Sequence, residues 1–495
     1  MLNHPLESQQ FDIPYSFAKT MGILVKEVRP DSVDLWVRND TKLQALLELQ
    51  RVYQRSIVPH EIPLEQFNSI LTDNYAQSGA SSAFAGDIET HQDLIKLIQE
   101  LPEVDDLLEA EGDAPIIRMI NAIFTQALRD RASDIHIEPY KAKSIVRFRV
   151  DGALRNIVEP HRALHSALVS RIKVMAELDI AEKRFPQDGR ITLKIAGKII
   201  DVRVSTLPTG HGERVVLRIL EKDGQQLSLA KLGMSEMVQS KVDHLVNQPH
   251  GIFLVTGPTG SGKTTTLYSA FSTLNTNVLN IMTVEDPIEY NLPNISQTQV
   301  NSKIDMDFAK ALRSILRQDP DVIMIGEIRD FETAQIAVQS SLTGHLVLAT
   351  LHTNNAVSAL TRLIDMKIEP FLLASSLSGV LAQRLVRCLC KDCRTAYIPN
   401  KVELALLTTT SPPEFLYRPV GCASCSGSGY NGRLGIYELL VVDDEMKRLM
   451  HDNVSEQVIK EYAISQGMRD LRQDGLRWVE SGVTSLEELL SVTKD

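Results

Sequence analysis

The sequence has no run of eighteen apolar residues, so nothing in it predicts a helix that crosses a membrane. Its first residues lack the charged segment and apolar stretch of a secretory signal peptide, from which we expect a protein that stays in the cytosol. Basic residues are not in excess. The formal net charge is −11, which argues against a broad surface for nucleic-acid phosphates, although a local basic channel is compatible with it.

Cysteine is absent from most of the chain. The five cysteines all fall between Cys388 and Cys425, which is too clustered for residues that merely fill a core. In a reducing compartment, such clustering favours a metal site over disulfides. With 495 residues, 43% hydrophobic and 23% charged, the rest of the composition is that of an ordinary globular protein with about three or four domains.

Four of the cysteines form two C-x-x-C pairs, Cys390 with Cys393 and Cys422 with Cys425. Each pair supplies two thiolates, and four thiolates close a tetrahedral structural Zn²⁺ site. The gap between the pairs is somewhat longer than in a usual zinc ribbon, and a redox C-x-x-C would need only one pair. Cys388 falls outside the pattern and is expected to be a spectator. We predict a zinc subdomain over about residues 386–430.

The most informative stretch lies between residues 251 and 270. Residues 252–255 form a short apolar run, typical of a buried strand, and residues 264–270 begin a helix. The segment between them fits the pattern G-x-x-x-x-G-K-[ST] of a loop that binds nucleotide phosphates. The predicted nucleotide-binding residues are Gly257, Pro258, Thr259, Gly260, Ser261, Gly262, Lys263, Thr264 and Thr265.

Each residue type in this loop has a chemical reason to be there. The glycines let the backbone turn tightly, so that successive N–H groups point at one anion, and the helix start adds its own donors. Lys263 can reach the β- and γ-phosphates, and the Thr264 hydroxyl can ligate Mg²⁺. The alternative is a glycine-rich turn that binds nothing. Because strand and helix flank the motif, we predict binding of ATP with Mg²⁺.

A doubly wound, mainly parallel sheet is predicted from about residue 224 to the end, in the form of a RecA-like motor domain. Three further apolar strands follow the loop, at residues 280–284, 322–325 and 346–349, and they alternate with helices at 307–316 and 332–342. Helices are also expected near the end, at residues 446–450, 458–466 and 486–492. In sheets of this kind, ligands bind beyond the carboxyl ends of the strands.

Polar residues at these strand ends are the candidate catalytic groups. Glu327 is the best candidate to orient or deprotonate the attacking water, beside Mg²⁺ and the γ-phosphate. Glu285 is a second carboxylate, suited to hold water or metal. His345 and His352 flank the next strand and can sense the γ-phosphate, although a lone histidine is more often simply packed.

Residues 113–223 are predicted to form an α+β domain that bears arginines. Helices are expected over 115–131 and 164–176, and strands over 134–138, 144–150, 153–158, 191–195, 198–204 and 214–219. Arginines lie at strand-compatible spacing, and they either cover solvated faces or approach the nucleotide of a neighbouring subunit. They are Arg147, Arg149, Arg203, Arg214 and Arg218.

Residues 1–80 are predicted to form a small α/β docking domain. A short helix over 13–22, a hairpin of strands 23–28 and 32–37, and a helix over 41–53 are expected there. The segment carries no visible chemistry, so its role is docking, regulation or structure alone. Residues 81–112 are small, polar and then strongly acidic, which indicates a linker.

Several of these stretches together resemble the secretion ATPase superfamily, which powers type II secretion and type IV pili. The resemblance rests on the phosphate loop, an aspartate box, a second Walker box, a histidine box, the tetracysteine and one strand of the second domain. They are residues 257–264, 283–289, 313–329, 343–353, 390–425 and 131–139. The short first domain, which opens with IPYSFA at residues 13–18, is similar to that of the type II secretion branch.

The resemblance implies a cytoplasmic homo-hexamer, peripheral on the inner membrane, that hydrolyses ATP to power protein export across the outer membrane. It implies that closure between the second domain and the motor domain produces mechanical work. It also implies that the first domain docks on the cytoplasmic part of an inner-membrane secretion protein. Arg203 and Arg218 are implied to reach the nucleotide of a neighbouring subunit, as charge-stabilising fingers.

Two alternatives share the motor chemistry. A type IV pilus assembly ATPase would differ in its membrane partner, and such ATPases tend to carry a longer first domain. A nucleic-acid translocase would move DNA or RNA, but the acidic balance and the 5% aromatic content argue against it, since single-strand tracks use aromatic stacking in basic grooves. We therefore expect no nucleic-acid partner.

Overall fold

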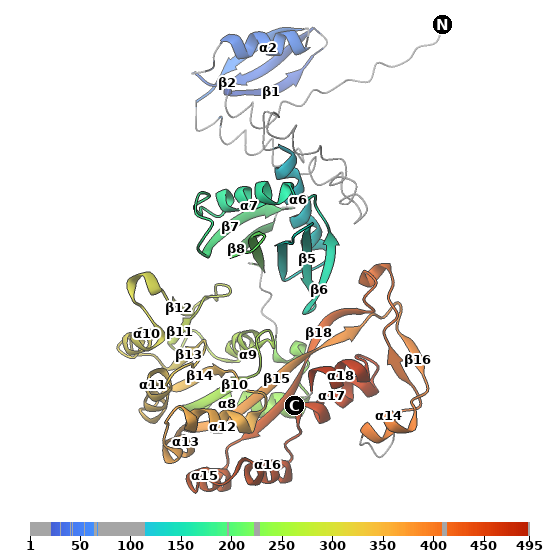
Figure 1. Cartoon of the computed structure of the whole chain (residues 1–495). Coiled ribbons are helices and arrows are strands. Elements are labelled where there is room, and N and C mark those ends of the chain that lie inside the picture. The colour runs from blue at the N-terminus through green and yellow to red at the C-terminus, as the bar shows by residue number, and fades with distance from the viewer. Residues whose placement is uncertain are drawn as a thin grey trace. The chain divides into compact units, whose positions relative to one another are not determined.

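The computed structural model describes residues 21–29, 31–39, 41, 43–53, 55–63, 67, 114–195, 198–221, 228–407 and 413–493 (Figure 1). The chain divides into two compact units, residues 1–148 with 154–219 and residues 149–153 with 220–495. Within the described residues, no helix combines the length and apolar character that a membrane crossing requires. The predicted linker at 81–112, and residues 13–20 of the first predicted helix, lie outside the described residues. The predicted domain boundaries stay predictions.

A three-stranded sheet forms the first part of the chain. The predicted hairpin is confirmed: β1 (Ile23–Val28) pairs antiparallel with β2 (Ser32–Val37). β2 then runs parallel to β3 (Ser56–Glu61), and a parallel pair needs a crossover, which the predicted helix α2 (Leu43–Tyr53) supplies. β3 was not predicted. It contains Pro59 and is mostly exposed, as an edge strand can be.

A six-stranded sheet with order β6-β5-β4-β9-β8-β7 follows. It confirms the predicted α+β region, with two strands longer than expected. Its strands are β4 (Asp134–Pro139), β5 (Ser144–Val150), β6 (Ala153–Val158), β7 (Gln187–Ile195), β8 (Lys198–Thr209) and β9 (Gly212–Glu221). Its helices are α6 (Ala114–Arg129) and α7 (Leu164–Met175). Apolar residues of α6, such as Met119 and Ile123, are fully buried.

The seven-stranded motor sheet has the order β12-β11-β13-β14-β10-β15-β18. Every neighbouring pair is parallel except β15 with β18, so the predicted mainly parallel sheet is confirmed. Its strands are β10 (Gly251–Thr256), β11 (Ile281–Glu285), β12 (Ser296–Gln299), β13 (Val322–Ile325), β14 (Leu346–Leu351), β15 (Leu377–Leu389) and β18 (Tyr430–Val441).

Helices cover both faces of this sheet (Figure 1). Leu254 of β10 packs into the apolar cluster on one face, whereas Phe253 and Val255 pack into the cluster on the other. The first face carries α10 (Phe308–Ile315), α11 (Phe331–Leu342), α12 (Ala356–Asp365), α13 (Pro370–Ser376), α15 (Asp444–His451) and α16 (Glu456–Ser465). The second carries α8 (Glu236–Val246) and α9 (Lys263–Ala270). This is the predicted doubly wound arrangement.

The long strands β15 and β18 were not predicted. They have 13 and 12 residues and form one antiparallel ribbon, and the chain between them makes an insertion. The insertion contains β16 (Thr395–Tyr397), α14 (Lys401–Leu406) and β17 (Leu416–Arg418). α17 (Leu471–Glu480) and α18 (Leu486–Val492) pack with it in a separate apolar cluster.

Candidate active site

The loop after β10 turns at three glycines. Gly257, Gly260 and Gly262 have φ angles of +150°, +80° and +87°, which side chains with a Cβ rarely adopt. A Cβ at Gly257 would also lie 2.4 Å from the carbonyl oxygen of Gln383. α9 begins at Lys263, so the unpaired N–H groups of its first turn face the loop. The flanking strand and helix are confirmed, and the loop has the geometry of an anion cradle.

The ammonium of Lys263 lies inside this loop. Its Nζ donates to the carbonyl oxygens of Gly257 (2.8 Å) and Pro258 (3.2 Å), and it lies 3.4 Å from Nδ1 of His352. Burial lowers the pKa of Lys263 to about 8, although the charge of Glu327 acts in the opposite direction. A buried ammonium among neutral acceptors gains most from a partner of full negative charge. Lys263 is therefore placed to bind a phosphate.

His352 connects Lys263 to the predicted catalytic carboxylate. Its Nε2 lies 3.1 Å from Oε1 of Glu327. Since Nδ1 faces an ammonium donor, the neutral ring carries its proton on Nε2 and donates it to Glu327. The N–H of Thr353, the next residue, donates to the Thr256 hydroxyl at 2.9 Å, which ties this segment to the end of β10.

Glu327 follows β13, and its second oxygen accepts from Nε of Arg329 at 2.7 Å. Arg329 also approaches Asp286, with 3.9 Å between the charged atoms. The structure thus brings Lys263, His352 and Glu327 together, at the carboxyl ends of three neighbouring parallel strands. A carboxylate beside a phosphate cradle, held by an imidazole and a guanidinium, can orient a water molecule and accept its proton.

Glu285 lies at the same sheet edge but points into the protein. It is 2% exposed, and its oxygens accept hydrogen bonds from Tyr268, Thr283 and Gln297. Burial, together with the charge of Glu285 and the hydrogen bond to it, raises the pKa of Tyr268. Its contacts are those of a residue that joins α9 to β11 and β12. The predicted role in holding water or metal stays a prediction.

His345 lies away from the other predicted residues. It precedes β14, and its carbonyl oxygen accepts from Gly251 at the start of β10. His352 follows the same strand, so six strand residues, about 20 Å, separate the two histidines. The His345 ring lies 2.9 Å from the carbonyl oxygen of Ser340. The geometry gives no support to a γ-phosphate contact for this residue.

Gln383 is a site residue that sequence reasoning missed. It comes from β15, is 1% exposed and donates to the carbonyl oxygen of Ser261 at 2.6 Å. Its own carbonyl oxygen accepts from the Thr266 hydroxyl at 2.8 Å. Gln383 therefore clamps the loop to the first turns of α9. A polar residue inside an apolar strand was the available signal, but the strand itself was not recognised.

The arginines of the six-stranded sheet gather around two buried carboxylates. Glu138 accepts from Nε and Nη2 of Arg147, both at 2.8 Å, and lies 2.7 Å from Nη2 of Arg214. Burial acts to raise the pKa of Glu138, but the hydrogen bond of Arg147 and the charges of both arginines outweigh it, so the pKa is lowered.

Arg218, one of the two predicted fingers, is also held by a carboxylate. Its Nε donates to Asp134 at 2.9 Å, and its side chain is 55% exposed. Arg203, the other, lies on β8 opposite Arg190 of β7. Both stand on the sheet with their backbone fixed, and their role toward a nucleotide stays a prediction.

The four paired cysteines meet in the insertion between β15 and β18. The sulfur atoms of Cys390, Cys393, Cys422 and Cys425 all lie within 4.8 Å of one another, and the shortest separations are 3.7 and 3.8 Å. A tetrahedral metal with bonds of about 2.3 Å to sulfur requires separations of about 3.8 Å. Backbone N–H groups also donate to these sulfurs. The cluster has the geometry of a four-sulfur metal site.

Comparison with known proteins identifies relatives along the whole chain. Residues 109–491 match the model of the family described as type II/IV secretion system protein, and residues 12–75 match the model of an amino-terminal domain of GSPII protein E. The type II secretion system protein HxcR of Pseudomonas aeruginosa is 56% identical over 98% of this chain and 99% of that protein. The type II secretion system ATPase E of Vibrio cholerae is 50% identical over 100% and 99%.

Solved structures share the fold. The pilus retraction motor PilT, crystallised with bound ADP, superposes with a TM-score of 0.53 at 26% identity and covers 76% of this chain and 97% of its own. The ATPase DotB of Legionella pneumophila has a TM-score of 0.55 at 19% identity, over 75% of this chain and 94% of its own. These findings confirm the resemblance and the predicted fold class.

The buried ammonium predicts how nucleotide affinity depends on pH. Below about pH 8, Lys263 is already protonated in the nucleotide-free protein, so affinity for a triphosphate is nearly constant. Above that pH, binding must first restore a proton, so affinity falls by up to about tenfold per pH unit. Titration with a fluorescent ATP analogue between about pH 7 and pH 9.5, at constant ionic strength, measures this.

Lys263→Arg is the matched control, because arginine stays charged throughout the range. Whatever its affinity, its pH profile should be flat above pH 8. An equal decline in both proteins would assign the effect to another group.

Proposed function

Because the chain belongs to the type II/IV secretion system protein family, we propose that it is the ATPase that powers type II secretion. The observation that carries the proposal is the meeting of Lys263, His352 and Glu327 at one sheet edge, beside a glycine-rich loop. The relatives named for type II secretion match over almost the full length of both chains. ATP is the substrate, and PilT with its bound ADP supports a nucleotide in this loop.

The loop and its lysine bind the triphosphate. The N–H groups of the loop and of the first turn of α9 surround the phosphates, and Lys263 places its charge against the β- and γ-phosphates. Glu327 orients the attacking water and accepts its proton. His352 holds Glu327 through Nε2, so its role is to position the carboxylate. Since positioning is part of the catalytic step, loss of either contact lowers the rate more than the affinity.

Mg²⁺ is the cation that we propose to accompany ATP. Thr264 stands at the start of α9, half-buried, and among the described residues no protein group engages its hydroxyl. A free hydroxyl in this place fits the ligand that Mg²⁺ needs. When bound, Mg²⁺ neutralises charge on the phosphate oxygens. The binding and orientation of the triphosphate remain the work of the loop, Lys263 and Glu327.

We propose Zn²⁺ as the metal of the tetracysteine. Four thiolates and no other nearby ligand among the described residues are the donor set of a structural zinc site. Its role is to close the insertion, which is too small to build a large core of its own.

The proposed assembly is a homo-hexamer in which Arg203 and Arg218 reach the nucleotide of a neighbouring subunit. The carboxylate of Asp134 limits the rotamers of Arg218 while leaving its side chain half exposed, which supports an arginine that acts on a group outside its own fold. A hexamer also fits a site whose charge-stabilising arginines are supplied by a neighbour.

We place the protein in the cytoplasm, peripheral on the inner membrane. The first domain is proposed to bind the cytoplasmic part of an inner-membrane type II secretion protein, and the match of residues 12–75 to an amino-terminal domain of GSPII protein E supports this branch over pilus assembly. The same match supports protein export over nucleic-acid movement.

Replacing Glu327 separates catalysis from binding. Glu327→Gln keeps the shape of the side chain but cannot accept a proton, so kcat for ATP hydrolysis should fall by about a hundredfold or more, while nucleotide affinity changes only a few-fold. Steady-state turnover and binding of an ATP analogue measure the two effects. The control is Glu332→Gln, an exposed carboxylate on α11 that pairs with Arg313. Normal turnover of Glu327→Gln would remove this residue from the mechanism.

Metal content tests the tetracysteine. Elemental analysis of freshly purified protein should find about one zinc per chain, and Cys393→Ser should lose most of it, since three thiolates hold zinc less tightly than four. Cys388→Ser serves as the control, because Cys388 lies outside the cluster and should keep the metal. Absence of metal from the unmodified protein would contradict the assignment.

A further inference from the structure

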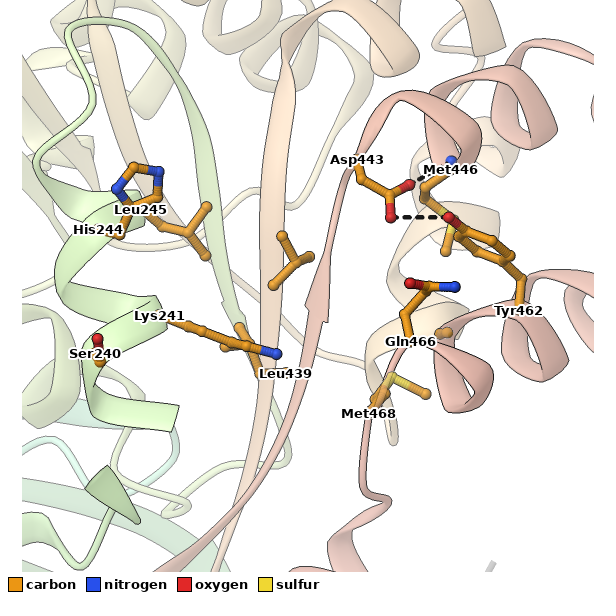
Figure 2. Close-up of a pocket in the computed structure, with 12 residues that line it drawn as sticks. Ser240, Lys241, His244, Leu245, Leu439, Asp443, Met446, Tyr462, Gln466 and Met468 are labelled. Atoms are coloured by element: carbon orange, nitrogen blue, oxygen red, sulfur yellow. Dashed lines mark hydrogen bonds between the residues drawn. The ribbon is translucent and has the colours of Figure 1, made fainter. Parts of the chain in front are cut away.

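The free edge of the motor sheet faces a groove. β18 is the last strand of that sheet, and a cavity of about 460 Å³ lies against it. Figure 2 shows α8 on one side of this cavity, with Lys241 extending toward β18, and Asp443, Tyr462 and Gln466 on the other. A second hollow shares Lys241, Leu439 and Met468 with the first and continues past Tyr437. The groove therefore follows the strand.

The backbone of β18 is open where the groove is widest. In the antiparallel register with β15, alternate residues direct their N–H and C=O groups away from β15. These residues include Tyr437, Leu439 and Val441, and the Tyr437 N–H donates to Asp474 at 2.9 Å. Among the described residues, no partner engages the outward groups of Leu439 and Val441. A strand edge of this kind is a template for another strand.

The groove carries positive charge. Lys241 and Arg469 line it, both are exposed, and neither has an ion-pair partner among the described residues. Its carboxylates are already engaged inside the protein. Asp443 accepts from Met446 N–H and the Tyr462 hydroxyl, and Asp474 pairs with Arg477 (Figure 2). The charges left for a ligand are therefore basic.

We propose that this groove binds an acidic, extended peptide segment of a partner protein, which adds to β18 as a further strand. Main-chain hydrogen bonds to Leu439 and Val441 supply the pairing, and Lys241 and Arg469 select acidic side chains. Apolar side chains of the peptide rest on Leu439, Met446 and Met468.

A second copy of this chain fits the same edge less well. Pairing two β18 edges would place Lys241 and Arg469 of one protomer against the same residues of the other, and facing like charges are destabilising. An acidic segment meets these cations with complementary charge. The proposal does not depend on nucleotide binding, and its residues lie outside the catalytic site.

Three synthetic peptides test the proposal on the full-length protein. The first is capped, about seven residues long, and alternates valine with glutamate. The second replaces glutamate with lysine, and the third is the first with N-methylated amides that cannot pair as a strand. Fluorescence anisotropy measures binding, and hydrogen–deuterium exchange reports the amides of Leu439 and Val441. Only the first peptide should bind well and slow exchange at these two amides.

Charge exchange at the groove sharpens the test. Lys241→Glu and Arg469→Glu should each weaken the glutamate peptide by up to about fivefold or more and strengthen the lysine peptide. Lys447→Glu, on the exposed side of α15, is the control and should change neither.

Four outcomes would overturn the proposal: no binding at about 1 mM, equal binding of the glutamate and lysine peptides, unaltered binding after N-methylation, or protection elsewhere in the chain. Concentration-dependent self-association that slows exchange at Leu439 and Val441 without peptide would assign the edge to a second copy instead. ATP turnover of the variants, unchanged from the parent protein, shows that they fold.

Discussion

The site depends on four central strands that run in the same direction. Since β11, β13, β14 and β10 are parallel neighbours, their carboxyl ends meet at one edge, and residues about a hundred positions apart in sequence come together there. Lys263 meets His352, and His352 meets Glu327, only because of this order. A change in strand order would leave each side chain intact and the chemistry absent.

This edge could be predicted from the sequence because its signals are local. The glycine motif, the short apolar runs and the polar residue after each run lie within a few positions of one another, and the parallel-sheet rule then joins them. The rest depends on distant pairing. β15 contains glycine and arginines among its apolar residues, so it lacks a simple period, and its extended form comes from β10 on one side and β18 on the other. Gln383 was missed for this reason.

The direction of a side chain is likewise set by tertiary contacts. Glu285 and Glu327 both follow predicted strands, yet one turns toward Tyr268 and Gln297 inside the protein and the other toward His352 and Arg329. His345 and His352 both flank β14, at opposite ends of it. Position along the chain identifies the edge of the sheet, but only packing decides which carboxylate or imidazole faces the phosphate cradle.

The ribbon of β15 and β18 has a mechanical consequence (Figure 1). It is one stiff two-stranded arm, about 40 Å long for the 13 residues of β15, with the cysteine cluster at its outer end and Gln383 partway along. Gln383 grips the phosphate loop, so the arm works as a lever with its short end at the nucleotide. Any push on the cysteine-bound tip, whatever protein delivers it, is felt as torque at the loop, and each turnover can in return swing the tip.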